Sequence, residues 1–501
     1  MTAELRANTV IVGAGFAGLA AGIALRRAGV TDFVILERAG SVGGTWRENR
    51  YPGVACDVPA HLYALESHPW PDWTRTFAPG EEIRAYLERV AEDAGLLPHI
   101  RFGHELTDAR WTGDGWAVTA ARSPLPGESS AEGDRSEVII RTDHLILACG
   151  RLTEPRIPHV AGLSSFDGPV LHSARWPDDL DVDGKRVAVI GTGASAVQLA
   201  PALADRGADV TVFQRTPAWI VPRGDRAHTA AERDEWRDVA GALDETRAEL
   251  YAEGEARFPS RSGDAAAAAA AGAAAIARLN AAIDDPRLRA ALTPDYAFGC
   301  KRVVLSDDFY PAIASGAVSL EPSALAAIDD GRLVAASGAR HDADVIVLAT
   351  GFRATRQPYA PLVTGEHGTT LDEHWSGGFT AVASTLVTGF PNLFVLGGPN
   401  ATLGHNSAVL LLEAQAALSA DLIRAGAPVR VSPAAEARAT AEVDALAAGT
   451  PWLTGGCRNW YVDERSGRLT LIWPSTVADF RARLDDVRQE LTGAPAPSGW
   501  S

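Results

Sequence analysis

Two glycine-rich segments have the residue types and spacing that bind the diphosphate of a dinucleotide. Gly13, Gly15 and Gly18 follow the apolar run Thr9 to Val12, and the next apolar run ends at Glu37, 24 residues after Gly13. Gly13 permits a tight turn, Gly15 lets the backbone approach a pyrophosphate, and Gly18 permits close packing of helix on strand. Glu37 can accept hydrogen bonds from ribose hydroxyls. Strand, loop, helix, strand and acid in this order predict a dinucleotide-binding βαβ unit.

The second segment repeats this plan with one change of charge. Its loop residues are Gly191, Gly193, Ser195 and Ala196. Arg215 stands 24 residues after Gly191, the place that Glu37 has in the first unit. A carboxylate suits a free ribose 2′-hydroxyl, whereas a guanidinium suits a 2′-phosphate through bidentate hydrogen bonds. The sequence therefore predicts FAD at the first loop and NADPH, in preference to NADH, at the second.

Further residues with possible roles at the cofactors lie in four turn-rich segments. They are Gly44, Thr45 and Trp46 after the first unit, Asp57 in a loop, the cations Lys301 and Arg302 after a glycine, and Asn406 before an apolar helix. A helix beginning near Asn406 would point backbone N–H groups at an anionic or carbonyl group, such as that of a flavin. The structural alternatives are a packed tryptophan, an aspartate that caps a turn and a solvated basic pair.

The order of the predicted elements indicates an α/β protein with two Rossmann-like dinucleotide-binding domains, one for FAD and one for NADP, with a helical insertion in the NADP domain. The expected division of the chain is as follows: 1–150 and 356–501 form the FAD domain, 151–180 a linker, 181–215 and 296–355 the NADP domain, and 216–295 the insertion.

Composition restricts the partners and the compartment. The chain has 501 residues and a formal net charge of -17, which argues against nucleic acid and anionic membranes as partners. The alanine run Ala265 to Ala275 is too short and too weakly hydrophobic to span a membrane. The four cysteines, Cys56, Cys149, Cys300 and Cys457, form no CxxC pair. We therefore expect no dithiol redox centre, no metal site and a cytoplasmic location.

A short motif between the two glycine loops points to a particular family. Residues 166–177 read FDGPVLHSARWP, so that Phe166, Gly168, His172 and Trp176 stand at fixed spacing before a proline. This pattern resembles the fingerprint of Baeyer–Villiger monooxygenases, flavoenzymes that insert one atom of dioxygen beside a ketone carbonyl. The resemblance extends over nearly the whole chain, through the segments GGTW, YPGVACD, GTGASA, FQRTPAW, GCKR, DVIVLATGF, GFPNLFVLGGPN and CRNWY.

The resemblance implies roles for individual residues. Arg302 matches the active-site arginine of the family, and Asp57 matches the acid that pairs with it. Arg215 and Lys301 match residues at the NADP 2′-phosphate. The linker positions thought to couple domain motion to cofactor binding are Phe166, Gly168, His172 and Trp176, and Trp460 is similar to a tryptophan on a mobile C-terminal loop over NADP. The implied reaction uses NADPH, FAD and O₂, proceeds through a flavin peroxide, and gives an ester or a lactone.

Three other functions are compatible with parts of the sequence. A flavin-containing monooxygenase that oxygenates soft nitrogen or sulfur would share both cofactor loops but would need no arginine to hold an oxyanion. A flavin or disulfide reductase would need a dithiol or another acceptor site, and a nucleotide sensor would need no Arg302.

The segment DVPAHLY after Cys56 differs from that of the best-known cyclic-ketone enzymes and looks more like a branch acting on aryl or aliphatic ketones. The ketone and the oligomeric state stay open.

Overall fold

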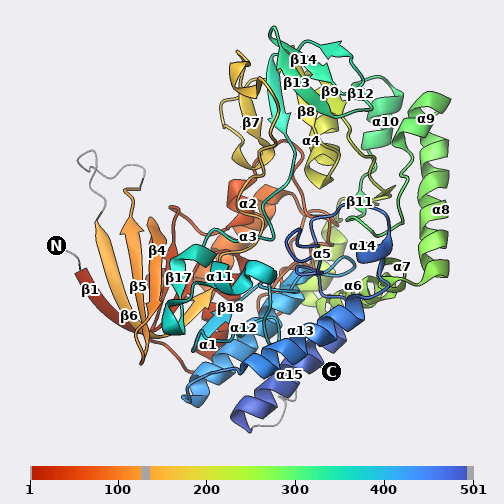
Figure 1. Ribbon diagram of the computed structural model, residues 1–501. Helices are drawn as coiled ribbons and strands as arrows, with labels where there is room; N and C mark the ends of the chain where they lie inside the picture. The colour runs from red at the N-terminus through yellow and green to blue at the C-terminus, as the bar shows by residue number, and fades with distance from the viewer. Residues whose placement is uncertain (1–2, 126–135, 494–501) are drawn as a thin grey trace.

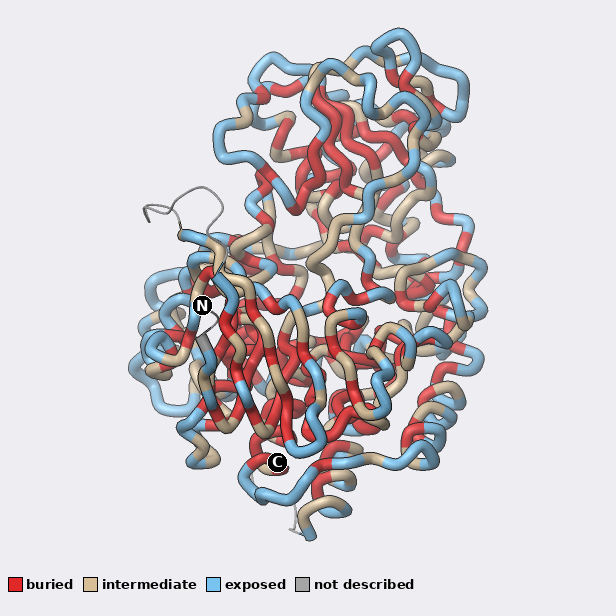
Figure 2. The backbone as a smooth tube through the Cα atoms, turned by 60° about the vertical axis from the view of Figure 1, so that its left-hand side comes forward, coloured by how far each residue is buried: buried red, intermediate tan, exposed pale blue. Residues whose placement is uncertain are grey.

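The chain forms two lobes, each built on its own β-sheet, mixed in the first lobe and parallel in the second (Figure 1). The computed structural model describes residues 3–125 and 136–493. Figure 2 shows buried residues concentrated in the strands at the centre of each lobe, with exposed loops around them. The first lobe contains both ends of the described chain and the second lobe is inserted between them. This arrangement confirms the predicted α/β fold with two dinucleotide-binding units.

The sheet of the first lobe has the strand order β17-β4-β5-β6-β1-β2-β3, with β18 also paired to β6. Its strands are β1 (Ala3–Val12), β2 (Phe33–Glu37), β3 (Ile100–Phe102), β4 (His104–Trp111), β5 (Trp116–Arg122), β6 (Glu137–Leu147), β17 (Val363–Thr364) and β18 (Leu393–Val395). β1 lies between β6 and β2 and is parallel to both, whereas β4, β5 and β6 are antiparallel neighbours. The carboxyl ends of β1 and β2 thus meet at one edge, where Gly13 and Glu37 lie.

Helices surround the sheet of the first lobe. They are α1 (Phe16–Arg27), α3 (Gly80–Asp93), α12 (Ala408–Ala425), α13 (Pro433–Ala447) and α15 (Val477–Thr492), with the short α2 (Thr45–Glu48), α11 (Leu371–His374) and α14 (Pro451–Thr454). The core under them is made of apolar side chains from α1, α12, α15 and the central strands, including Leu19, Ile35, Leu411 and Phe480. Burial of this apolar surface, at about 25 cal/mol per Å², fixes α1 and α12 and therefore the loops that precede them.

The second lobe has a five-stranded parallel sheet in the order β12-β9-β8-β16-β7. Its strands are β7 (Val170–His172), β8 (Arg186–Ile190), β9 (Asp209–Phe213), β12 (Val318–Glu321) and β16 (Val345–Leu348), with helices α4 (Ala194–Ala204) and α10 (Phe309–Ala314). A three-stranded sheet of β13 (Leu325–Asp329), β14 (Arg332–Ala335) and β15 (Arg340–His341) adjoins it. Because β7 pairs with β16, part of the expected linker is an edge strand of this sheet.

The expected helical insertion lies between the short parallel strands β10 (Ile220–Val221) and β11 (Val304–Leu305). Its helices are α5 (Ala230–Asp238), α6 (Ala242–Ala256), α7 (Pro259–Ser262), α8 (Ala265–Ala282) and α9 (Pro286–Leu292). α8 extends beyond the alanine run on which the prediction was based. By length and composition alone it could cross a membrane, so the prediction that this segment is too short was wrong. One such helix is weak evidence, and Gly272, Ala275 and Leu279 on one side of α8 are buried against the protein.

Candidate active site between the two lobes

Two glycines of the first loop, Gly13 and Gly18, have no space for a side chain. Gly13 has φ +106°, and a Cβ there would lie 2.6 Å from the Ala148 carbonyl oxygen; a Cβ on Gly18 would lie 1.8 Å from the Gly13 carbonyl oxygen. Gly15 is the N-cap of α1 and has no capping side chain. Because no side chain covers the helix N-terminus, its free N–H groups can receive a diphosphate. The geometry of this loop therefore fits FAD.

Glu37 is buried at the end of β2 and already has protein partners. Its Oε2 accepts a hydrogen bond from Ala14 N (2.9 Å), and its Oε1 accepts one from Ala39 N (2.9 Å) and pairs with Arg47 Nη1 (3.1 Å). Each carboxylate oxygen has two lone pairs, so Oε2 retains capacity for a ribose hydroxyl. The sequence did not indicate that Arg47 lies here.

The segment with Gly44, Thr45 and Trp46 packs against the first loop. A Cβ on Gly44, whose φ is +50°, would lie 3.1 Å from Gly15 Cα. Thr45 begins α2, and the buried Trp46 donates from Nε1 to the Tyr63 hydroxyl at 3.3 Å. The predicted neighbours of the first cofactor are therefore brought together by the fold.

The second glycine loop repeats this geometry with one difference. Gly191 has φ +123°, and a Cβ there would lie 2.5 Å from the Ala349 carbonyl oxygen. A Cβ on Gly193, the N-cap of α4, would meet no atom within 4 Å. Ser195 and Ala196 lie in the first turn of α4, and Ala196 is buried. The open space at Gly193 is at the helix N-terminus, where a diphosphate binds.

Arg215 and Lys301 bring two cations together beside this loop. Arg215 follows β9 and is exposed. Burial lowers the pKa of Lys301, and the charge of Arg215 lowers it further. The Lys301 ammonium lies 4.7 Å from the centroid of the Tyr296 ring. Two neighbouring cations fit a phosphate, so these residues are suited to the 2′-phosphate of NADPH.

Arg302 and Asp57 form an ion pair between the lobes. Arg302 Nε and Nη2 each lie 2.7 Å from Asp57 Oδ2, and Nη1 donates to the Leu403 carbonyl oxygen at 3.1 Å. Burial raises the pKa of Asp57, but the charge and hydrogen bonds of Arg302 outweigh burial and hold this pKa below its usual value. Asp57 in turn raises the pKa of Arg302, against the effect of burial. Both groups are therefore charged at neutral pH.

Tyr461 is a neighbour of Arg302 that the sequence analysis did not single out. It is 1% exposed; burial raises the pKa of its phenol, and the charge of Arg302 and a hydrogen bond with it act in the opposite direction. The residue directly follows Trp460 in the CRNWY segment. That position was the only sequence signal that pointed to it.

The side chain of Asn406 faces the insertion. Its Nδ2 donates to Glu255 Oε1 (2.8 Å) and to the Tyr251 carbonyl oxygen (3.2 Å), and its Oδ1 accepts from Ser407 N (2.8 Å). Glu255 also faces His405 Nε2 at 3.2 Å. The amide nitrogen of Asn406 is thus directed at the insertion, and its Oδ1 at the backbone that begins α12. The backbone at the start of α12 still fits the predicted role.

The motif residues at 166–177 connect the strands β7 and β16. His172 Nε2 donates to the Gly351 carbonyl oxygen at 3.0 Å, and its Nδ1 accepts from Ala174 N at 3.2 Å. A Cβ on Gly168 would lie 2.3 Å from the Asp344 carbonyl oxygen and 2.7 Å from Phe166 Cε1. Trp176 is buried in the core of the second lobe. The motif thus joins β7, where the chain enters the second lobe, to the end of β16, where the chain leaves it.

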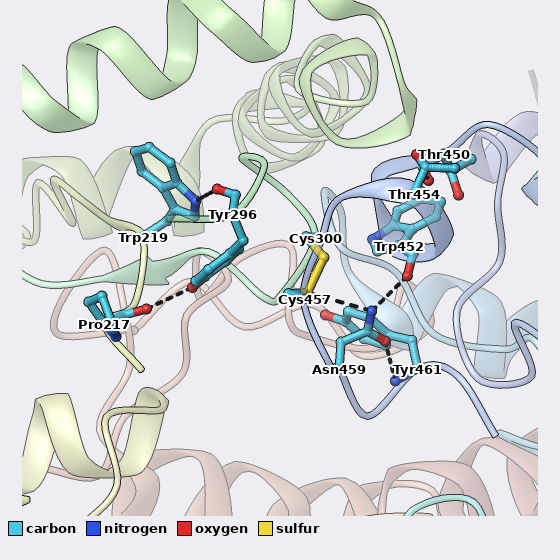
Figure 3. The surroundings of a disulfide bond; sticks show 10 residues. All are labelled: Pro217, Trp219, Tyr296, Cys300, Thr450, Trp452, Thr454, Cys457, Asn459 and Tyr461. Carbon is cyan, nitrogen blue, oxygen red and sulfur yellow. Dashed lines mark hydrogen bonds between the residues drawn. A yellow bond between two sulfur atoms is a disulfide. The ribbon is translucent and has the colours of Figure 1, made fainter. Parts of the chain in front are cut away.

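A disulfide joins two of the four cysteines, although the sequence contains no CxxC pair. Cys300 and Cys457, 157 positions apart, are bonded (Figure 3), whereas Cys56 and Cys149 are free. The bond joins the segment with Arg302 to the segment with Trp460, whose ring lies 4.4 Å from that of Tyr461. Sequence spacing missed the pair because only the tertiary fold brings the two segments together. In residues 3–125 and 136–493, no cluster of three or more His, Cys, Asp or Glu side chains is placed to hold a metal.

Comparisons with known proteins agree with this arrangement. The family model described as "Pyridine nucleotide-disulphide oxidoreductase" matches residues 7–239. A protein named Baeyer-Villiger monooxygenase from Streptomyces coelicolor is 42% identical over 98% of this chain and 93% of its own length. A protein of the same name from Pseudomonas aeruginosa is 36% identical over 97% of this chain and 92% of its own length.

Solved structures resemble the chain over almost its full length. An oxidised steroid monooxygenase bound to NADP has a TM-score of 0.82 at 30% identity, covering 97% of this chain and 98% of that one. A closed cyclohexanone monooxygenase has a TM-score of 0.83 at 26% identity, with the same coverage of both chains.

Proposed function

The chain belongs to the Baeyer–Villiger monooxygenase family, and we propose that Arg302, oriented by Asp57, is the residue on which its oxygen insertion depends. The enzyme uses FAD, NADPH and O₂ to insert one oxygen atom beside a ketone carbonyl, which gives an ester or a lactone. When bound, FAD reduced by NADPH supplies the activation of dioxygen. The protein residues supply binding, position and charge.

The observation that carries this proposal is the Arg302–Asp57 pair between the two lobes. Negative charge develops on the carbonyl oxygen of the ketone as that carbon is attacked, and a fixed cation nearby lowers the barrier. A guanidinium is suited to this task because it keeps its proton at every working pH. Asp57 fixes one edge of the guanidinium, and the Leu403 carbonyl oxygen fixes Nη1.

We assign the remaining predicted residues to cofactor binding and to coupling between the lobes. The first loop, Glu37 and the segment from Gly44 to Trp46 hold FAD; the second loop with Arg215 and Lys301 holds NADPH. The uncovered glycine loops and the paired cations support these assignments. Movement between the lobes is transmitted by Trp460 and by the motif residues Phe166, Gly168, His172 and Trp176.

The proposed division of the chain is as follows: the FAD part comprises 1–150 and 356–501, the linker 151–180, the NADP part 181–215 and 296–355, and the insertion 216–295.

The substrate is a small ketone. The proposed location is the cytoplasm, where the Cys300–Cys457 bond would be an uncommon kind of cross-link. An excess of acidic residues, reflected in the net charge of -17, supports the absence of nucleic-acid and anionic-membrane partners.

The test is the mass of the product. Purified FAD-loaded enzyme is incubated with NADPH and air and with a panel of linear, aryl and cyclic ketones plus one aryl sulfide. An ester or lactone one oxygen heavier than a ketone is the expected result. Sulfoxide as the sole product would favour oxygenation of soft sulfur, and would count against the proposal.

A further inference from the structure

We propose that the Cys300–Cys457 disulfide is a redox-controlled clamp between the two lobes, and that its reduction by a dithiol loosens the segment that carries Lys301 and Arg302. The clamp itself does not depend on the reaction that the enzyme performs. Its expected effect on the coenzyme rests on the proposed function, in which Lys301 holds the 2′-phosphate of NADPH.

The disulfide joins two parts of the chain that pack in separate cores. Cys300 follows Phe298, whose side chain packs against α8 of the insertion. Cys457 lies on the loop between Trp452 and Tyr461, two side chains that are buried in the core of the first lobe. The bond spans 157 positions of the sequence. It is therefore a covalent link between the first lobe and the chain that leaves the insertion.

The loop that carries Cys457 rests directly on the Cys300 segment (Figure 3). Asn459 Nδ2 donates to the Trp452 carbonyl oxygen at 2.8 Å and closes the base of the loop. Toward its tip, the Gly455 carbonyl oxygen accepts from Ala297 N at 2.9 Å, and a Cβ on Gly455 would lie 2.8 Å from Cys300 Cβ. These contacts keep the two cysteines close, so that the bond can form again after reduction.

The two cysteines differ in their access to solvent. Cys300 is 0% exposed, whereas Cys457 is partly exposed and lies between the exposed residues Gly456 and Arg458. The Arg458 side chain is 88% exposed. An external thiol can therefore approach the bond from the Cys457 side. Exposed disulfides are the ones that exchange readily, and disulfides in a cytoplasm are mostly transient or redox-sensing.

Reduction proceeds by thiol–disulfide exchange. A thiolate of the dithiol attacks Cys457 Sγ, and Cys300 Sγ leaves as a thiolate that takes up a proton. The second thiolate of the reductant then attacks the sulfur already bound to Cys457 and releases that cysteine as a thiol. The protein disulfide gains two electrons and two protons, and the dithiol becomes a disulfide. In the reverse direction, dioxygen oxidises the two thiols to the disulfide and is reduced to hydrogen peroxide.

Lys301 and Arg302 directly follow the clamped cysteine in the chain. In the oxidised protein the disulfide restrains this segment against the first lobe, where Arg302 also pairs with Asp57. Reduction removes the covalent restraint and leaves the noncovalent contacts. Lys301 must then be ordered each time the coenzyme binds, and this ordering lowers the affinity.

Peptide mapping tests the redox chemistry in the FAD-loaded holoenzyme. After purification in air and alkylation, Cys300 and Cys457 should be found joined. Excess dithiothreitol should convert both to alkylated thiols while FAD stays bound, and removal of the dithiol in air should restore the bond. Free thiols at both positions after aerobic purification, or a bond that survives dithiothreitol in the folded enzyme, would overturn the proposal.

Arg458 reports the state of the clamp without a catalytic assay. Trypsin should cleave after Arg458 about 10-fold faster in the reduced holoenzyme than in the oxidised one, because proteolysis follows the population of locally opened chain. Cys457→Ser should be cleaved at the faster rate in either buffer. Cleavage after Arg206, an exposed residue just beyond α4, is the internal reference and should stay constant. Equal rates after Arg458 in both redox states would contradict the clamp.

Calorimetry with NADP⁺ tests the effect on the coenzyme site. Reduction should raise the dissociation constant by about 3- to 10-fold, the cost of ordering one or two side chains anew. Cys457→Ser should bind NADP⁺ as weakly as the reduced wild type and should not respond to dithiothreitol. Cys149→Ser, at a free cysteine, is the matched control and should respond to dithiothreitol as the wild type does.

The outcomes separate the clamp from the proposed function. A wild-type dissociation constant that reduction leaves unchanged would refute the control of the coenzyme site, even in an enzyme that forms esters. If the wild type forms no ester from any ketone while tryptic cleavage and NADP⁺ binding both respond to reduction, the proposed function fails and the clamp stands.

Discussion

Arg302 presents two of its nitrogens to a single oxygen of Asp57, with Nε and Nη2 each 2.7 Å from Oδ2. The two residues are 245 positions apart, and each belongs to a different lobe. The pair exists only when the lobes are assembled. Because the remaining guanidinium nitrogen is fixed by the Leu403 carbonyl oxygen, three parts of the chain set the direction of one cation.

Asp57→Asn keeps the size of the side chain but removes the charge that orients Arg302. We expect ester formation to fall by about 10-fold or more, since a misdirected cation stabilises the developing charge less well. FAD content should stay the same. Steady-state product analysis by gas chromatography, with flavin absorbance for cofactor content, checks this. A variant with wild-type turnover would show that Asp57 has no orienting role.

Arg215→Gln removes one of the two cations assigned to the 2′-phosphate. KM for NADPH should rise by about 10- to 100-fold, the value of a charge-assisted contact, whereas KM for NADH should change little. Initial rates with both coenzymes give the ratio. Arg206→Gln, at an exposed arginine just beyond α4, is the control and should leave both constants as they are. Parallel changes for both coenzymes in Arg215→Gln would contradict the assignment.

Gly193→Ala adds one methyl group to an open position at the N-terminus of α4. No protein atom lies within 4 Å of that methyl, so Tm of the protein without NADPH should be unchanged within about 1 °C. KM for NADPH should increase, because the methyl occupies space needed by the diphosphate. Thermal unfolding and initial rates together test this. An unchanged KM would place the diphosphate elsewhere.

Glu413, on α12, should make stability depend on pH. Its Oε1 accepts from Glu66 N at 2.8 Å, while its Oε2 is buried without a partner in the described part of the chain. Burial, with the charge of Glu66 as a smaller cause, raises the pKa of Glu413 to about 7. The folded state therefore binds more protons than the unfolded state between pH 4.5 and 7, and stability decreases as pH rises through this window, by about 3 kcal/mol.

Glu413→Gln should remove this part of the pH dependence. The variant retains the acceptor for Glu66 N and carries no charge, so it should be more stable than the wild type at pH 8 and similar to it at pH 5. Urea unfolding at both pH values measures the difference. If both proteins lost the same stability between pH 5 and 8, another group would be responsible.

Local sequence was sufficient for the two nucleotide loops. Gly13 and Gly191 both have positive φ. Glu37 ends β2 and Arg215 follows β9, as the repeat predicted. These features depend on a few consecutive residues, so spacing along the chain identifies them. The family resemblance, more than spacing, connected Arg302 to Asp57, because no local pattern relates residues in separate lobes.

Features that depend on contacts between distant segments were missed or misread. The Cys300–Cys457 bond could not be predicted from spacing, because a separation of 157 residues says nothing about proximity in space. The hydrogen bond of the Asn406 side chain with Glu255 of the insertion could not be read from the sequence, because the two residues are 151 positions apart. Tyr461 was overlooked because a buried tyrosine acquires its chemistry from Arg302, which only the tertiary structure places beside it.

The most direct test of the account compares ester formation with NADPH oxidation in Arg302→Ala. Both rates are measured in the same sample with a ketone that the wild type converts. We predict that ester formation falls at least about 100-fold, while slow NADPH oxidation continues and FAD stays bound, because the flavin chemistry does not need the guanidinium at the ketone. Ester formation near the wild-type rate in this variant would contradict the central role of Arg302.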